Sequence, residues 1–236
     1  MGAAAVFTAG LDFALNARES YEAAAGALGF FVGDVICAHQ KHTDNVLLCD
    51  RGFLEENKDR LPLPEGFVYD AMVTDVPGVL LSVRSADCVP ALFWDGEHGA
   101  VGAAHCGWRG TLQKLQQKTA LEMQRLYKTD LGHLRVAMGP CIQKCCYEVS
   151  DEFRENFLSA LGGRVEPYFA PKGGGKHMCD LPGINVGLLS ELLGGENIGN
   201  IEVSKHCTCC EEGFFSHRRQ GERRGTHAAF IGLKTI

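Results

Sequence analysis

The stretch Ser85–Gly110 reads SADCVPALFWDGEHGAVGAAHCGWRG, and it places the thiol of Cys88 and the imidazole of His105 in two apolar segments. The residues before Trp94 are mostly apolar or β-branched. Asp95-Gly96-Glu97-His98 then interrupts the run, and a second segment of small apolar residues follows. This pattern predicts a β-hairpin at the centre of the chain.

A type II′ turn with Gly96 and Glu97 as its two loop residues would place Cys88 directly opposite His105. Opposed residues on one sheet face have Cβ atoms about 5 Å apart, so a thiolate and an imidazole could share one metal ion or one proton. Pro90 cannot donate a ladder hydrogen bond, which favours a bulge or an edge position there. A slip of one residue would put the pair on opposite faces.

Length and charge limit the function classes. The chain has 236 residues, and no Pro/Ser-rich or highly charged linker divides it, so we expect residues 1–236 to form one domain. The net charge of −6 argues against nucleic acid or an anionic membrane as the main partner, because both attract concentrated Lys and Arg. Small molecules are therefore the expected ligands.

The chain contains 11 cysteines. Its first residues, MGAAAVFTAG, lack the basic region and apolar core of a signal peptide, and no apolar run reaches the length of a membrane span. Gly2 does not match a myristoylation motif, because Val6 stands where that motif has Ser or Thr. We therefore expect a cytoplasmic protein whose cysteines are thiols or metal ligands rather than disulfides.

Helical and strand patterns alternate along the chain, which predicts an α/β fold whose sheet is at least partly antiparallel. Helices are expected at 16–29, 111–128, from Ser150 as an N-cap, and at 180–193; strands at 133–139, 197–203 and 228–233; and a surface connection at 51–66. Lys172-Gly-Gly-Gly-Lys176 lacks the spacing of a phosphate-binding loop, so it is expected to be a mobile loop.

A third ligand beside Cys88 and His105 would complete a catalytic zinc site with its fourth position open. His42 is the candidate and His39 its rival; on a strand the two would face opposite sides. Such a zinc ion would lower the pKa of a bound water to about 7. Two alternatives remain open, namely a buried Cys–His pair that only packs the core and a Cys88 nucleophile with His105 as its base.

Two further clusters carry reactive side chains. Cys141, Cys145 and Cys146 could join Cys207, Cys209 and Cys210 in a structural metal site, although the clusters do not form the two C-x-x-C pairs of a zinc ribbon. The segment Phe214-Phe215-Ser216-His217-Arg218-Arg219 combines aromatic rings with two fixed cations, which suits a planar ring and an anion such as phosphate. A solvated basic loop is the alternative.

Ordered motifs along residues 36–233 resemble the peptidoglycan editing factor or polyphenol-oxidase-like family, also called YfiH-type or laccase-domain proteins. The shared motifs are Gln40-x-His42, Thr74-Asp75-x-Pro77-Gly78, Ala86-Asp87-Cys88-x-Pro90, Ala104-His105-x-Gly107-Trp108-Arg109-Gly110, Gly139-Pro140, Tyr147-Glu148-Val149, Asp180-Leu181 with Asn185, Cys207-Thr208, and Phe214-Phe215-Ser216 with Arg218-Arg219. The chain departs from the family pattern at Thr43, His217 and Thr226, where glycine, tyrosine and arginine are usual.

The resemblance implies a mixed β-sheet sandwich flanked by helices, with His42, Cys88 and His105 as zinc ligands. It also implies a purine nucleoside phosphorylase acting on adenosine, inosine and methylthioadenosine, with adenosine deaminase activity at the same site. Purine nucleosides and phosphate would be its partners. By family analogy Asp87 is an acid or base, and the residues expected to bind substrate and phosphate are Arg109, Asn185, Ser216, Arg218 and Arg219.

The sequence leaves three alternative functions open. The family name also suggests a copper-dependent polyphenol oxidase with Cu²⁺ in the site, but the chain has 9 histidines and none of the close His-x-His pairs common in multicopper oxidases. A peptidoglycan-precursor editing hydrolase and a protein that acts mainly through partner enzymes are the remaining alternatives. The oligomeric state is left open.

Overall fold

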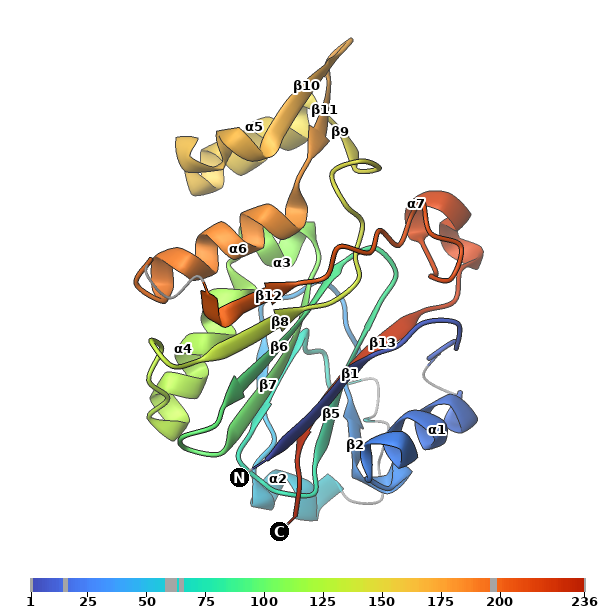
Figure 1. Ribbon diagram of the computed structural model, residues 1–236, viewed down its shortest axis with the longest axis vertical. Helices are drawn as coiled ribbons and strands as arrows, with labels where there is room; N and C mark the ends of the chain where they lie inside the picture. Colours follow the sequence, from blue (N-terminus) through green and yellow to red (C-terminus); the bar gives the residue numbers. More distant parts are fainter. Residues whose placement is uncertain (1, 15–16, 58–62, 64–65, 196–198, 236) are drawn as a thin grey trace.

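Two β-sheets packed face to face, with helices outside them, form the body of the molecule (Figure 1). The computed structural model describes residues 2–14, 17–57, 63, 66–195 and 199–235. The strands are β1 (Ala3–Phe7), β2 (Val35–Cys37), β3 (Val46–Leu48), β4 (Ala71–Thr74), β5 (Leu80–Ser85), β6 (Val89–Asp95), β7 (Ala100–Cys106), β8 (Arg135–Met138), β9 (Glu148–Ser150), β10 (Phe169–Gly173), β11 (Lys176–Cys179), β12 (Ile201–Val203) and β13 (His227–Leu233). The α-helices are α1 (Arg18–Leu28), α2 (Arg51–Asn57), α3 (Trp108–Leu112), α4 (Leu115–Tyr127), α5 (Asp151–Leu161), α6 (Leu181–Leu192) and α7 (His217–Gln220).

Both large sheets mix parallel and antiparallel pairs. The four-stranded sheet has the order β1-β13-β5-β2, in which only β2 and β5 are parallel. The six-stranded sheet has the order β12-β8-β6-β7-β4-β3, with parallel pairs at its two edges. A third, small sheet of β9, β10 and β11 projects with α5 from one end of the sandwich (Figure 1). The predicted mixed α/β sandwich flanked by helices is confirmed.

Successive side chains of a strand point to opposite faces of its sheet, so one strand can contribute to two separate hydrophobic clusters. In β7, Val101 and Ala103 pack between the two large sheets, whereas Ala100 and Ala104 pack under α4 and α6. In β13, Phe230 points the other way, into the cluster beneath α1. Helices therefore cover the outer face of each sheet, and the inner faces bury each other.

The apolar run that the sequence places before Asp95 is two strands in two different sheets. Strand β5 belongs to the four-stranded sheet and β6 to the six-stranded one, and the chain crosses between them at Ala86-Asp87-Cys88. Asp87 has φ of 96°, in the left-handed region that residues with a side chain rarely occupy. This bend places Asp87 and Cys88 at the rim of the sandwich, between the sheets.

The β6–β7 hairpin is confirmed, but the predicted register is wrong. His105 pairs with Pro90 instead of Cys88, and the loop has four residues, 96–99, instead of two. The longer loop is closed by Asp95, whose Oδ1 accepts hydrogen bonds from the amides of Glu97 and His98. Because the pairing is displaced by two residues, Cys88 and His105 remain on the same side of the sheet.

The predicted helices mostly hold. Helix α1 ends at Gly29 with φ of 80°, and Ser150 caps α5 by accepting a hydrogen bond from the amide of Phe153. Two predictions were wrong: the 51–66 connection begins with α2, and the expected 111–128 helix is interrupted before α4, where Lys114 takes φ of 58°. Residues 58–62 and 64–65 of that connection lie outside the described residues.

The other expected segments are accounted for. Strands β8, β12 and β13 and helix α6 lie where they were expected, although residues 197–198 of the expected third strand are outside the described residues. In the glycine run, Gly173 ends β10, and Gly174 and Gly175 form the turn to β11. Among the described residues, no helix is long and apolar enough to cross a membrane.

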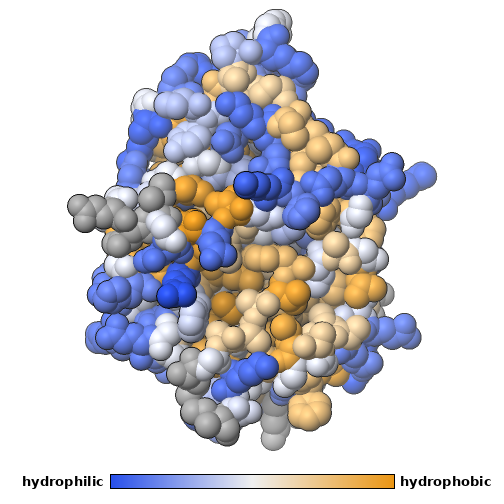
Figure 2. All heavy atoms as spheres, in the orientation of Figure 1, coloured by the Kyte–Doolittle hydropathy of each residue, from blue (hydrophilic) through white to orange (hydrophobic). Residues whose placement is uncertain are grey.

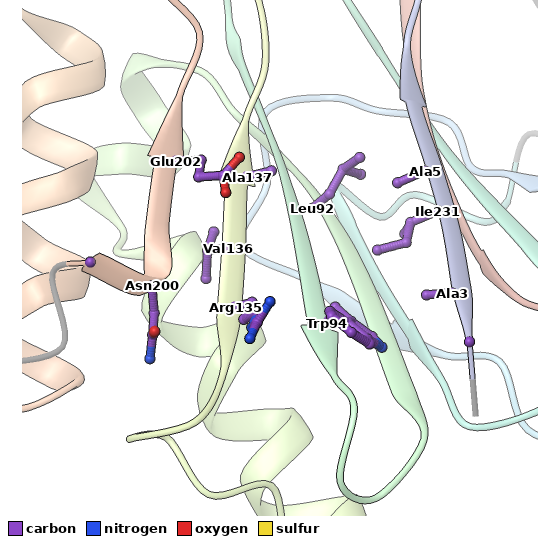
Figure 3. Close-up of a pocket in the computed structure, with 12 residues that line it drawn as sticks. Ala3, Ala5, Leu92, Trp94, Arg135, Val136, Ala137, Asn200, Glu202 and Ile231 are labelled. Carbon is purple, nitrogen blue, oxygen red and sulfur yellow. The ribbon is translucent and has the colours of Figure 1, made fainter.

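A hollow of about 600 Å³ opens where the two large sheets diverge. Its walls are Ala3 and Ala5 of β1, Ile231 of β13 and Leu92 and Trp94 of β6, with Arg135 and Glu202 on the opposite side (Figure 3). Figure 2 shows apolar side chains gathered on this face of the molecule. Among the described residues that line it, Arg135 and Glu202 are the only ionisable ones.

Candidate functional site

Three potential metal ligands from three separate segments meet at the rim of the sandwich. His42 lies on the loop between β2 and β3, Cys88 at the crossing between the sheets, and His105 near the end of β7. Their ligand atoms all lie within 4.8 Å of one another, and His42 Nε2 is 3.7 Å from Cys88 Sγ. His105 is buried, while His42 and Cys88 are partly exposed. The group therefore has a side open toward solvent.

A buried carboxylate, Asp70, orients this group. Its Oδ1 lies 2.8 Å from Nδ1 of His105, which leaves Nε2 of that ring for the site. A carboxylate bonded to the second nitrogen of a ligating histidine is the usual support of a metal-binding imidazole.

Asp70 also fixes the loop that carries His42. Its two oxygens accept hydrogen bonds from the amides of Lys41, His42 and Thr43, at 3.1, 3.0 and 2.7 Å. His42 has φ of 60°, and such a left-handed residue lets successive N–H groups converge on one anion. One carboxylate thus positions two of the three potential ligands.

The charges of the group reinforce one another. Burial raises the pKa of Cys88, but the charge and hydrogen bond of His105 and the hydrogen bond of His42 lower it to about 6. Burial lowers the pKa of His105, but the charge of Cys88 and the hydrogen bond of Asp70 raise it to about 9. Burial raises the pKa of Asp70, and its bonds to His105 and Thr43 bring it down to about 2. Cys88 is therefore favoured as a thiolate, the form that binds metals.

The donor set suits a zinc ion. Zn–S and Zn–N bonds of about 2.3 and 2.0 Å in a tetrahedron imply an N···S separation of roughly 3.5 Å, close to the 3.7 Å between His42 and Cys88. Two imidazoles and one thiolate leave a fourth position open, as in catalytic zinc sites. Copper sites with two histidines and one cysteine usually add an axial methionine, and the described residues that line the pocket include no methionine.

A pocket of about 440 Å³ opens beside His42 and Cys88. Trp108 and Tyr147 give it two aromatic walls, and each ring carries an arginine: the guanidinium of Arg109 is 4.2 Å from the Trp108 centroid and that of Arg218 is 5.2 Å from Tyr147. The remaining lining residues are Ala86, Asp87, Ile142, Leu181, His217, Glu222 and Arg224. The pocket therefore offers aromatic faces for a planar ring and guanidinium groups for an anion.

Asp87 lies in the same pocket, with both carboxylate oxygens occupied. It accepts hydrogen bonds from Thr208 Oγ1 at 2.7 Å, Ser216 Oγ at 3.1 Å and the amide of Arg218 at 2.7 Å. On a regular strand Asp87 would face away from Cys88. The sheet crossing and the left-handed φ of Asp87 instead place both residues in the pocket.

Only some of the other residues expected to bind substrate lie in the pocket. Arg109 and Arg218 line the pocket, whereas Asn185, Ser216 and Arg219 do not. Buried Asn185 donates to Thr111 Oγ1 and Leu181 O, which ties α6 to α3. Ser216 caps α7.

The guanidinium of Arg219 is used within its own loop. It donates to the carbonyls of Thr208, Cys209 and Glu211 at 3.1, 2.6 and 3.1 Å. The ring of Phe214 packs near His206 and His227, so the aromatic walls of the pocket come from other segments.

His39, the rival ligand, lies outside the group. Its Nε2 is 2.9 Å from the carbonyl oxygen of Leu63. Sequence reasoning also missed Asp70 and Arg224. For Asp70 a signal existed, because it is a single carboxylate directly before the apolar strand β4.

Comparison with known proteins gives a consistent set of relatives. Residues 9–234 match the family model described as multi-copper polyphenol oxidoreductase laccase. A protein named adenosine deaminase RL5, from an unknown prokaryotic organism, is 34% identical over 225 residues, which cover 94% of this chain and 83% of that protein. A purine nucleoside phosphorylase of Deinococcus radiodurans is 35% identical over 211 residues, covering 89% and 74% of the two chains.

Solved structures share the fold along nearly the whole chain. The Bacillus licheniformis hypothetical protein YfiH matches with a TM-score of 0.86 and 27% identity, covering 98% of this chain and 93% of that one. YlmD from Geobacillus stearothermophilus matches with a TM-score of 0.85 and 27% identity, covering 99% and 93%.

Proposed function

Because the chain belongs to the multi-copper polyphenol oxidoreductase laccase family, whose relatives here include proteins named purine nucleoside phosphorylase and adenosine deaminase, we propose that it is a zinc-dependent purine nucleoside phosphorylase. Its substrates under this proposal are adenosine, inosine and methylthioadenosine with phosphate. Adenosine deaminase activity is proposed at the same site. The relatives support an enzyme of purine nucleoside metabolism, and the finer assignments are ours.

The observation that carries the proposal is the meeting of His42, Cys88 and His105 beside a pocket with aromatic walls and several cations. A purine is a planar ring, which the faces of Trp108 and Tyr147 suit. Phosphate is an anion, which Arg109, Arg218 and Arg224 suit. A site for a nucleoside and phosphate together needs both features.

The proposed ligands of the zinc ion are His42, Cys88 and His105. When bound, zinc supplies Lewis-acid polarisation of an oxygen and lowers the pKa of a water on it. Asp70 keeps the imidazole of His105 and the loop of His42 oriented toward that position. The partly exposed thiolate of Cys88 would add negative charge that favours binding of the ion.

In phosphorolysis an oxygen of phosphate attacks C1′ of the ribose, the bond from C1′ to the purine nitrogen breaks, and the purine leaves with its electron pair and takes up a proton. Arg109 and Arg218 would hold the phosphate by charge-assisted hydrogen bonds. Asp87 is the proposed acid or base, since it lies in the same pocket. In deamination water adds at C6 of adenosine, and ammonia leaves.

The direct test is chromatography of the products after incubation of purified protein with adenosine, with and without phosphate. We expect adenine and ribose 1-phosphate only when phosphate is present, and inosine without it. Inosine and methylthioadenosine are tested in the same way. A chelator should abolish both reactions and zinc should restore them.

His42→Ala and His39→Ala form a matched pair for this assay. Both remove a histidine from the same loop, but only His42 has a nitrogen in the ligand group. We expect His42→Ala to lose zinc and turnover and His39→Ala to keep both. Zinc-loaded, folded protein that converts no nucleoside would refute the proposal, and peptidoglycan precursors would then be tested. Turnover that follows copper instead of zinc would refute the metal assignment.

We also propose a cytoplasmic location. All 11 cysteines are free in the structure, including several buried thiols. A reducing compartment would keep them so.

A further inference from the structure

A second cluster of potential metal ligands lies in a different part of the molecule. Cys145 and Cys146 are on the connection from β8 to β9, and Cys207 and Cys210 are on the connection from β12 to α7. Their four sulfur atoms all lie within 4.8 Å of one another. We refer to these four residues as the cysteine cluster.

The two connections lie side by side and are joined by their backbones. Cys141 and Cys207 form an isolated parallel bridge, and the amide of Thr208 donates to the carbonyl of Cys141 at 3.0 Å. The amide of Gln143 donates to Cys207 Sγ at 3.5 Å. The cysteine cluster is therefore a convergence built by the fold.

The spacing of the sulfur atoms fits four-coordinate zinc. A tetrahedral Zn–S₄ site with bonds of about 2.3 Å has sulfurs roughly 3.8 Å apart. Cys145 Sγ lies 3.7 Å from Cys146 Sγ and 4.0 Å from Cys210 Sγ. Cys207 and Cys210 also have C-x-x-C spacing, and the adjacent pair Cys145-Cys146 replaces the second pair of a zinc ribbon.

We propose that Cys145, Cys146, Cys207 and Cys210 bind one Zn²⁺ ion as a structural site, separate from the His42 group. Binding exchanges four thiol protons for the ion and involves no oxidation. All four positions around the metal are filled by protein, which is typical of structural rather than catalytic zinc.

The charge surrounding the cluster favours this arrangement. A zinc ion with four thiolates carries a net charge of −2. The guanidinium of Arg218 donates to the carbonyl of Cys146 at 3.3 Å, and that of Arg219 to the carbonyl of Cys209 at 2.6 Å. Two cations are thus held on the backbone of the two connections that supply the sulfurs.

The site would brace one wall of the pocket. Tyr147 follows Cys146 directly, and Thr208, inside the C-x-x-C loop, donates to Asp87 at 2.7 Å. A metal that joins the two connections would hold Tyr147 and Asp87 in place. The zinc assignment itself stands whether or not the pocket binds nucleosides.

The test is the zinc content of the whole chain, purified under reducing conditions without chelator and measured by native mass spectrometry and elemental analysis. We expect about two zinc ions per chain, one for each group. Cys210→Ser and Cys145→Ser should each lower the content to about one, and so should His42→Ala. The double variant His42→Ala/Cys210→Ser should hold none.

Cys209→Ser is the matched control, because it makes the same change in the same loop at a sulfur outside the cluster, and it should keep both ions. Wild-type protein with one ion, lost in His42→Ala and kept in Cys210→Ser, would overturn the proposal. Iron in place of the second zinc, or a disulfide among the four cysteines, detected as a loss of two hydrogen masses, would also overturn it.

Cobalt substitution separates the two groups without relying on variants that fold poorly. A four-thiolate cobalt site has intense d–d bands in the visible range and sulfur-to-metal charge-transfer bands in the near ultraviolet, whose intensity increases with the number of thiolate ligands. Wild-type protein loaded with Co²⁺ should show this spectrum, and His42→Ala should retain it. A spectrum that indicates only one thiolate ligand would refute the cysteine cluster as a metal site.

Discussion

At the scale of single residues, Asp70 supports two of the three potential metal ligands although it does not line the pocket. Its carboxylate bonds the ring of His105 and three consecutive amides of the loop that carries His42. It is buried, and the hydroxyl of Thr43 donates a further hydrogen bond to it at 2.9 Å, so its negative charge is compensated by protein groups. Loss of that charge should therefore disturb the positions of both His42 and His105.

Asp70→Asn is expected to weaken zinc binding at the His42 group by about 10–100-fold, the usual effect of removing such a support. The amide keeps the size of the side chain but loses acceptor capacity toward His105 and the loop. Zinc affinity is measured by competition with a chelator, in a Cys210→Ser background so that one site is read. Asp95→Asn is the control, because Asp95 is also a buried carboxylate bonded to a histidine, at the far end of β6. An equal loss of zinc affinity in Asp70→Asn and Asp95→Asn would indicate a general folding defect.

Asp87→Asn tests whether Asp87 transfers a proton. If it does, kcat should fall by roughly 10²–10⁴-fold, and one limb of the pH–rate profile should disappear. Thr208→Val removes one donor to Asp87 but leaves the carboxylate, so it should change KM while both limbs of the pH–rate profile remain. An Asp87→Asn enzyme that keeps both limbs of the profile would limit Asp87 to a positioning role.

At the scale of elements, the site depends on how closely α3 approaches the crossing between β5 and β6. Gly107 precedes α3, and a Cβ atom built there would lie 2.8 Å from Cys88 Sγ and 2.9 Å from His42 Cδ2. Its φ of −67° is open to any residue. Glycine is therefore required at this position by space and not by backbone conformation.

Gly107→Ala should displace Cys88 or His42 and lower zinc affinity at that group by at least about 10-fold, as other disturbances of ligand support do. Gly110→Ala, three residues further along and inside α3, is the control, since its Cβ would have nearest contacts of 3.4 Å. Because alanine is favoured over glycine inside a helix, Gly110→Ala should raise the free energy of unfolding by roughly 0.5–1 kcal/mol. Zinc titration and thermal unfolding of both variants test this prediction. Unchanged zinc affinity in Gly107→Ala would show that the site can accommodate a Cβ atom at position 107.

The same elements show what sequence could and could not predict. Three local signals predicted the structure correctly: Gly29 ends α1, Ser150 caps α5, and the break in the apolar run at 95–98 marks a hairpin. The split of one apolar run into β5 and β6 was missed, because nothing local to Ala86-Asp87-Cys88 says that two sheets meet there. Asp70 was missed although it directly precedes β4, because its partner His105 is distant in sequence.

At the scale of the whole molecule, stability should depend on a histidine that the site does not use. His227 begins β13 and pairs with Ser85, the last residue of β5. Burial lowers the pKa of His227 to about 4, although the carbonyl of Pro140 and the charge of Asp87 oppose the shift. Its ring is therefore neutral in the folded protein at neutral pH.

The free energy of unfolding should consequently fall as the pH is lowered from about 6.5 to about 4, because the unfolded chain takes up a proton there that the folded chain does not. The shift corresponds to roughly 3 kcal/mol when it is fully expressed near the lower limit. Leucine has no group that binds a proton, so between these pH values the free energy of unfolding of His227→Leu should fall by about that much less than that of the wild type. Urea unfolding at several pH values measures this difference. His133→Leu removes a largely exposed imidazole and should keep the wild-type dependence. If His227→Leu lost stability on acidification as steeply as the wild type, the acid sensitivity would originate elsewhere, in the carboxylates and metal ligands of the rim.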